Sequence, residues 1–284
     1  MKSNISIIGA GKVGNTLARL WYTAGVEIKA VYNRNYANAE QLAEYVDADA
    51  VDTLEKVINS AEIIFLTVAD DALSAIANEL AKIDLTDKAI VHTSGALSID
   101  IFSELALKGA SLGSLHPAFP FSDIESAMKN LSGASFAIEA SDEKLQRQLI
   151  YLAELLGGKI IIIPEGQKAI YHASLVLISN YTVTLYSLAE NLLKPLTSDQ
   201  SAIDSALMTL LRATVENIAN HGIPDALTGP LARADGGTIQ GHLQAIDDDA
   251  LKSLYISLAR LSYPMLEQRG INTHFIDKYL QDEE

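Results

Sequence analysis

The sequence contains no cysteine among its 284 residues. This absence excludes disulfide bonds, thiolate nucleophiles, iron–sulfur clusters and cysteine-based zinc sites, and it predicts a protein of the reducing cytoplasm. The six histidines are scattered and show no spacing typical of metal ligands, such as H-E-x-x-H. We therefore expect no metal site.

Positive charge is also scarce, with 21 Lys and Arg residues against 36 Asp and Glu residues and a net charge of −15. Nucleic-acid binding needs a basic surface, so we expect no nucleic-acid partner. Residues 173–189 carry no charge, but their Ser, Thr and Asn side chains make them too polar for a membrane span, which needs ~20 mainly apolar residues. We predict instead a helix buried between domains or subunits, and no membrane partner.

The first residues follow the order strand, glycine turn and helix. After the apolar run Ile5, Ile7 and Ile8 comes the fingerprint Gly9-Ala10-Gly11-Lys12-Val13-Gly14. In this pattern the first glycine permits a tight turn, the second lets the backbone approach a pyrophosphate, and the third allows close packing of helix and strand. The free N–H groups at the helix start then face the phosphates. The pattern predicts a dinucleotide site; a tight turn without ligand is the alternative.

The rest of the first half alternates strands with helices. We expect strands at residues 26–32, 62–68, 88–92, 111–116, 134–138 and 159–163, with helices over 36–46, 72–82, 100–107 and 143–156. Such alternation predicts an α/β fold, a doubly wound parallel sheet of Rossmann type. The chain is long enough for two domains and, at 49% hydrophobic residues, apolar enough for sizeable cores.

The pattern changes at Pro164, after which no strand pattern returns. We expect a long helix to about Leu193, ended by Pro195, and further helices over residues 199–221, 238–245 and 248–268. The predicted domains are therefore residues 1–163, which bind the cofactor, and residues 164–284, which are helical and bind substrate or a second subunit. Residues 282–284 are expected to be a frayed tail.

The end of the second strand discriminates between the two nicotinamide dinucleotides. An acidic residue there would bind the ribose 2′-hydroxyl of NAD, whereas a basic residue binds the 2′-phosphate of NADP. This chain has Asn33 and Arg34 and no acidic residue, so we predict NADP as the cofactor. Val68 and Ala69, after a later strand, are expected to line the same site. Arg34 as a solvated loop residue is the alternative.

Polar side chains after the glycine fingerprint form the candidate catalytic site. Ser94 follows a strand and either donates to the substrate or caps the next helix. Lys168 and His172 lie four residues apart, on one face of a helix that also contains Asn180. Reduction of a carbonyl needs a proton donor and a group that holds the developing alkoxide, which such residues supply. The alternatives are a solvated lysine and a core histidine.

Two loops complete the candidate site. His116 ends a strand and precedes a proline-stiffened loop. In the helical half, a glycine-rich loop carries Arg233 and Asp235, and Arg233 is suited to binding a substrate carboxylate. An interdomain loop without a role in binding is the alternative for this second segment.

The glycine fingerprint, the Asn33-Arg34 pair and the helical C-terminal domain together resemble the 6-phosphogluconate dehydrogenase-type superfamily. This superfamily includes hydroxyacid dehydrogenases, ketopantoate reductase and pyrroline-5-carboxylate reductase. Ser94-Gly95 and Lys168…His172 resemble the serine–glycine loop and the lysine–asparagine pair of the hydroxyacid enzymes, with histidine in place of asparagine. Over the whole chain, the sequence looks like a set of candidate oxidoreductases that join a Rossmann-like domain to a helical domain of unknown function. The motifs on which this second resemblance rests are His116-Pro117, Lys168…Tyr171-His172, Ser179-Asn180-Tyr181 and Gly229-Pro230-Leu231-Ala232-Arg233-Ala234-Asp235.

The resemblance implies an NADP-dependent oxidoreductase that reduces a small carbonyl compound, such as a 2-oxo acid of the ketopantoate type. Two alternatives stay open: an NADP-binding sensor without catalysis, and an imine reductase similar to pyrroline-5-carboxylate reductase. We also expect a homodimer built on the C-terminal helices, because the uncharged helix over residues 173–189 is too apolar to face water alone.

Overall fold

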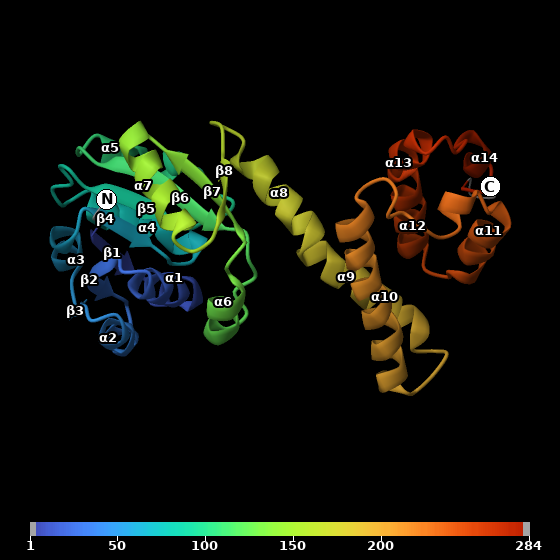
Figure 1. The fold of residues 1–284 in the computed structure, drawn as a ribbon, viewed down its shortest axis with the longest axis horizontal. Helices are drawn as coiled ribbons and strands as arrows, with labels where there is room; N and C mark the ends of the chain where they lie inside the picture. Colours follow the sequence, from blue (N-terminus) through green and yellow to red (C-terminus); the bar gives the residue numbers. More distant parts are fainter. Residues whose placement is uncertain (1–3, 281–284) are drawn as a thin grey trace. The chain divides into compact units, whose positions relative to one another are not determined.

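The computed structural model describes residues 4–280. It contains two compact units, one ending at Ile178 and the other beginning at Ser179 (Figure 1). The predicted boundary, after residue 163, lies at the end of the last strand, and the first helix beyond it still belongs to the N-terminal unit. The tail expected at residues 282–284 lies outside the described residues.

The N-terminal unit is built on a sheet with the strand order β3-β2-β1-β4-β5-β6-β7-β8. The strands are β1 (Asn4–Ile8), β2 (Glu27–Tyr32), β3 (Asp49–Val51), β4 (Ile63–Leu66), β5 (Ala89–His92), β6 (Ser111–Pro117), β7 (Ser135–Ala140) and β8 (Lys159–Ile162). Buried β-branched and aromatic residues fill the central strands, as is typical of a sheet covered on both faces.

One pair of strands corrects the prediction of a fully parallel sheet, because β6 and β7 are antiparallel. A parallel neighbour needs a crossover over one face of the sheet. Here the chain after β6 forms the short helix α6 (Ile124–Asn130), which packs beside α1 (Lys12–Thr23), and returns so that Phe136 pairs with Pro117. The other neighbouring strands are parallel.

Helices cover both faces of the sheet, which confirms the doubly wound α/β fold. Trp21, Leu42 and Leu149 belong to the core on one face, under α1, α2 (Tyr36–Tyr45) and α7 (Glu143–Glu154). On the other face lie α3 (Leu54–Ser60), α4 (Asp70–Leu80), the 3-10 helix η1 (Ile99–Phe102) and α5 (Ser103–Ala106).

The described part of the C-terminal unit is helical and contains no strand, as predicted. Its elements are α9 (Asn180–Leu193), α10 (Gln200–His221), η2 (Leu231–Arg233), α11 (Gly236–Ala245), α12 (Asp249–Leu261), α13 (Tyr263–Gln268) and α14 (His274–Asp277). Two predicted helices are each divided. The first is α8 (Lys168–Ile178) followed by α9, and the second is interrupted at Ser262, before Pro264, where the proline ring cannot continue a helix.

Neither a membrane span nor a metal cluster is found in residues 4–280. No helix there is long and apolar enough to cross a membrane. No group of three or more His, Asp or Glu side chains within the same range is arranged to hold a metal ion.

Candidate functional site

The glycine turn has the conformation that its sequence predicts. Gly9 has a φ of +111°, which an L side chain rarely adopts, and a Cβ there would lie 2.8 Å from the Thr67 carbonyl oxygen. A Cβ on Gly14 would lie 2.1 Å from the Gly9 carbonyl oxygen, so this glycine allows α1 to pack against β1. A Cβ on Gly11 would meet nothing within 4 Å, which leaves open space in front of the turn. The structure has the tight turn predicted at Gly9 and the close helix–strand packing predicted at Gly14.

Helix α1 begins directly at this turn and has no side-chain cap at Gly11. Its first N–H groups therefore keep their capacity to donate to a ligand, and the helix dipole favours an anion there. A cavity of about 850 Å³ opens in front of the turn. Of the predicted cofactor residues, it is lined by Gly9, Gly11, Asn33, Arg34, Val68 and Ala69. Ala10, Lys12, Val13 and Gly14 form the turn and the helix start but do not line this cavity.

The end of β2 carries two residues with different tasks. The Asn33 carboxamide oxygen accepts from the Ala10 N–H at 3.0 Å, and its nitrogen donates to the Asn35 carbonyl at 2.9 Å. Asn33 therefore ties the glycine turn to the end of β2. Arg34 is exposed at the rim of the cavity, and in residues 4–280 no carboxylate pairs with it. Its guanidinium is available for a phosphate.

Ser94 is buried in the loop after β5, and its hydroxyl both donates and accepts hydrogen bonds within the protein. The hydroxyl donates to Asp70 Oδ2 at 2.8 Å and accepts from the N–H groups of Ala96 and Leu97 at 3.2 and 3.0 Å. The next helix, η1, is capped by Ser98 instead. Ser94 therefore shapes the loop after β5 and fixes it to the start of α4, which favours an ordering role over direct donation to a substrate.

Lys168 is the first residue of α8 and is only 2% exposed. Its ammonium donates to Ser114 Oγ on β6 and forms an ion pair at 3.3 Å with Glu139 Oε2 on β7. Burial lowers the pKa of Lys168, an effect that the charge of Glu139 opposes. A lysine buried to this degree needs such partners. The alternative of a solvated helix lysine is therefore wrong.

His116 lies at the end of β6, two residues beyond Ser114, and is contacted by the same helix. Its Nδ1 is 2.9 Å from the hydroxyl oxygen of Tyr171, and its ring lies edge-on to that of His172, with centroids 6.4 Å apart. A Cβ on Gly95 would lie 2.7 Å from His116 Nε2 and 2.8 Å from His172 Cδ2. The absence of a side chain at Gly95 thus makes room for both histidines, and α8 brings Lys168 and His172 to the same strand.

Burial keeps these groups in their neutral forms. Desolvation, and next to it the charge of Lys168, lowers the pKa of His116 to about 4 and that of His92, on β5, to about 3. Desolvation raises the pKa of the Tyr171 hydroxyl to about 12. At neutral pH the cluster holds uncharged imidazoles and an un-ionised phenol beside a lysine–glutamate pair.

The remaining predicted residues belong to the C-terminal unit. Asn180 is the first residue of α9 and is exposed. Asp235 caps α11 by accepting from the Thr238 N–H at 3.1 Å and from the Thr238 hydroxyl at 2.7 Å, and these bonds lower the pKa of its carboxyl. The cap gives Asp235 a structural task. Arg233 ends η2 and stays a candidate for binding substrate.

Sequence reasoning missed four residues of this site: Asp70, Ser114, Glu139 and Tyr171. Glu139 had a usable signal, because a carboxylate beside the apolar run Phe136-Ala137-Ile138 needs a buried partner. Tyr171 lies one position before His172, but only the fold shows that it reaches His116. Asp70 and Ser114 carry no signal of their own, since both are common at strand and helix ends.

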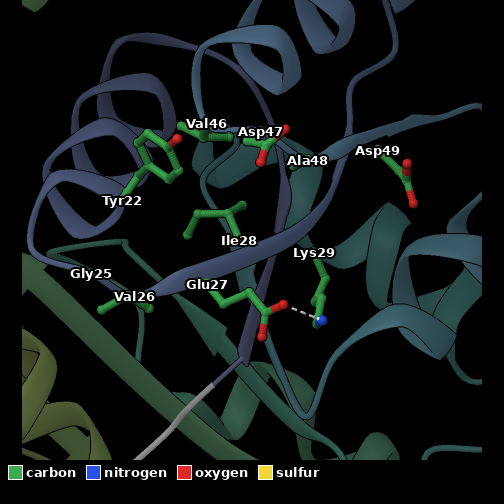
Figure 2. Close-up of a pocket in the computed structure, with 10 residues that line it drawn as sticks. All are labelled: Tyr22, Gly25, Val26, Glu27, Ile28, Lys29, Val46, Asp47, Ala48 and Asp49. Carbon is green, nitrogen blue, oxygen red and sulfur yellow. Dashed lines mark hydrogen bonds and ion pairs between the residues drawn. The ribbon is translucent and has the colours of Figure 1, made fainter.

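A second hollow lies at the opposite edge of the sheet, where β2 begins. Figure 2 shows its lining, which includes Tyr22, Glu27, Lys29, Asp47 and Asp49. Its volume is about 480 Å³. The Glu27–Lys29 ion pair there is largely exposed and contributes little to stability. Because open α/β sheets bind ligands beyond the carboxyl ends of their strands, this hollow is not part of the candidate site.

Fold and site together define a dinucleotide-binding protein of Rossmann type. Two family models agree with this class. Residues 1–117 match the Rossmann-like domain, and residues 134–262 match the Domain of unknown function (DUF2520). The chain therefore joins a Rossmann-like domain to a DUF2520 domain, which confirms the resemblance drawn from the sequence. The DUF2520 match begins just before β7 and so includes the last two strands of the sheet.

Solved structures resemble this chain over nearly its whole length. Protein TM1727 from Thermotoga maritima is 26% identical, with a TM-score of 0.77 and coverage of 93% of this chain and 99% of its own. BF3122 from Bacteroides fragilis, named as a candidate NADP oxidoreductase, is 26% identical, with a TM-score of 0.71 and coverage of 93% and 98%. A pyrroline-5-carboxylate reductase from Coxiella burnetii is 14% identical, with a TM-score of 0.61 and coverage of 94% and 98%, and shares the fold. No curated protein matches the chain.

Proposed function

We propose that the protein is an NADP-dependent oxidoreductase that transfers a hydride between NADPH and a small carbonyl compound. The observation that carries this proposal is the cavity of about 850 Å³ that runs from the glycine turn to Arg34. The name of BF3122 supports the same cofactor and reaction class. When bound, NADPH supplies the hydride. The narrowest form of the proposal is a 2-oxo acid substrate such as ketopantoate.

The residues present fit this cofactor. The uncapped start of α1 and the open space at Gly11 suit a pyrophosphate. Arg34, which pairs with no carboxylate of residues 4–280, suits the 2′-phosphate that distinguishes NADP from NAD. Val68 and Ala69 line the cavity just after β4, which lies between β1 and β5 in the sheet. The redox end of the dinucleotide would then lie near the loop that contains Gly95.

Lys168 is our candidate for stabilising the alkoxide that forms on the substrate. An ammonium has three N–H donors; one is donated to Ser114, and the charge is paired with that of Glu139. The remaining donor capacity and the positive charge suit a developing alkoxide. His116 and His172 would orient the substrate. Asn180 and Arg233 remain sequence-based candidates, with Arg233 proposed to bind a substrate carboxylate.

We also propose that two copies of the chain form a homodimer through the C-terminal helices. No residue of α9 is buried, and Ile203 is the buried residue of α10. Large apolar side chains on these helices are exposed, among them Val183 at 70% and Leu210 at 66%. Covering such a surface with a second copy would remove it from water. Light scattering should show a dimer that V183D weakens; a monomer at high micromolar concentration would refute this proposal.

A titration and a turnover assay test the function. NADPH should quench or shift the fluorescence of Trp21, the single tryptophan, and should be consumed with at least one carbonyl compound in a panel of 2-oxo acids, aldehydes, ketones and cyclic imines. Binding without consumption would support the sensor alternative, and consumption with imines alone would support the imine reductase. Absence of NADPH binding would overturn the proposal. A cytoplasmic location belongs to the same proposal and is testable by cell fractionation.

A further inference from the structure

Tyr171 and His116 form a hydrogen-bonded pair at the carboxyl edge of the sheet. The Tyr171 hydroxyl oxygen is 2.9 Å from His116 Nδ1, and the two rings meet edge-on at 82° with centroids 5.7 Å apart. The backbone of Gly95 supports the other side of the His116 ring, near Nε2. The imidazole is therefore held between α8 and the loop after β5.

The order of the strands places this pair next to the redox end of the proposed cofactor. Along the carboxyl edge, Arg34 follows β2, the glycine turn follows β1, Val68 follows β4 and Gly95 follows β5. A dinucleotide that begins at Arg34 and crosses the glycine turn ends toward β5. His116 on β6 is one strand further, where a substrate beside the cofactor would lie.

Two other polar side chains at this edge are already engaged, although Lys168 keeps donor capacity for the alkoxide. The Ser94 hydroxyl donates to Asp70 and accepts from the backbone N–H groups of Ala96 and Leu97. Lys168 is tied to Ser114 and Glu139. Tyr171 is different, because its neighbour His116 can act as the donor in their hydrogen bond and leave the phenolic proton free.

We propose that Tyr171 donates the proton that completes carbonyl reduction, and that His116 replaces it. The Tyr171 O–H bond breaks as the new O–H bond forms on the substrate oxygen. The phenolate then takes the Nδ1 proton of His116, and His116 Nε2 takes a proton from the solvent. Proton exchange with the solvent returns His116 to the tautomer with its proton on Nδ1, so one solvent proton is consumed for each carbonyl reduced. The two electrons come with the hydride, so no electron passes through these residues. This inference rests on the proposed function and leaves Lys168 as the stabilising cation.

The electrostatics of the pair agree with this assignment. Burial raises the pKa of Tyr171 to about 12 and lowers that of His116 to about 4, so both are neutral before the reaction. A phenol remains a stronger acid than the alcohol it would protonate. The charged and titratable groups that act on His116 are Lys168, which is paired with Glu139, and the imidazoles of His172 and His92.

The first test reads the tautomer of His116 without any turnover. Nitrogen NMR of histidine-labelled protein with bound NADP, assigned with His116→Asn, should show the proton on Nδ1 and a shift of that signal in Tyr171→Phe. A proton on Nε2 would mean that Tyr171 donates to His116, and this would overturn the proposal. Tyr151→Phe, on α7 and outside the site, is the matched control and should leave the signal unchanged.

The second test separates carbonyls from iminium ions, which arrive with their proton already in place. Tyr171→Phe should lower kcat for a carbonyl substrate by about 10²-fold or more, leave NADPH affinity unchanged, and keep most of the activity toward a cyclic iminium. Equal carbonyl turnover in parent and Tyr171→Phe would overturn the inference while the proposed function stands. A parent protein that binds no NADPH would overturn both.

Discussion

The buried Lys168–Glu139 pair leads to a prediction about stability. The same effect must be separated from catalysis when the activity of any Lys168 variant is interpreted. Both side chains are nearly inaccessible, at 2% and 6% exposure, and their charged atoms are 3.3 Å apart. Removing one member of such a pair leaves an uncompensated buried charge, at a cost of about 3–5 kcal/mol. We expect Lys168→Met to lower the free energy of unfolding by about this amount at pH 7. Adding Glu139→Gln should restore about half or more of it, because no charge is then left without a partner.

The fluorescence of the single tryptophan reports the unfolding of the N-terminal unit, which contains the Lys168–Glu139 pair. Trp21 is buried in α1, and its indole N–H donates to the Leu152 carbonyl at 3.0 Å, so its fluorescence during urea unfolding follows the N-terminal unit. The four proteins of the double-mutant cycle should give a coupling energy of about 2 kcal/mol or more. A Lys168→Met variant as stable as the parent would refute the reasoning. A kcat loss in Lys168→Met is then assigned to catalysis only if Lys168→Met/Glu139→Gln shows it as well.

Two further predictions concern the glycine turn and the buried histidine. Gly14→Ala places a Cβ 2.1 Å from the Gly9 carbonyl oxygen, so it should destabilise the N-terminal unit by about 1–3 kcal/mol and weaken NADPH binding; Gly11→Ala should spare stability in the same unfolding assay, and equal stabilities of the two would contradict the packing argument. His116 has a pKa of about 4 in the fold against an ordinary 6.5, so the unfolded chain binds more protons between these values and stability is lost as pH falls from about 6.5 toward 4. His116 should account for about 2 kcal/mol of the stability lost between pH 7 and pH 4.5. In unfolding curves at these two pH values, His116→Asn should therefore lose less stability than the parent by about this amount, while the contribution of His92 remains; identical acid sensitivity would count against the depressed pKa.

Much of the N-terminal unit could be predicted because its local patterns agree with its tertiary structure. The apolar run of β1 ends at Gly9, and β1, β2, β4 and β5 are each followed by a helical pattern. These strands, and the apolar run of β6, were therefore expected close to where they lie. The three-residue strand β3 and the seven-residue helices α3 and α6 were missed, because such short elements carry too few residues to show a period. The antiparallel direction of β7 depends on where the connection from β6 packs, which no local pattern contains.

The sequence predicts a residue of the candidate site only where its role can be recognised from its immediate neighbours in the chain. The glycine turn is such a case, because its backbone conformation requires glycine. Lys168 and His172 were expected on one face of a helix, but their partners come from strands 29 and more residues away in the chain. Long-range pairs such as Lys168–Glu139 and Tyr171–His116 arise from the order of the strands.

Cofactor selectivity tests the central claim most directly. Fluorescence titrations of the parent protein and Arg34→Ala with NADPH and NADH give four dissociation constants. We expect the parent to prefer NADPH, and Arg34→Ala to lose a charge-assisted phosphate contact of about 1.5–3 kcal/mol, which is roughly 10- to 100-fold in NADPH affinity, with NADH affinity nearly unchanged. Equal affinities of the parent for NADPH and NADH, or no binding of either, would contradict the account.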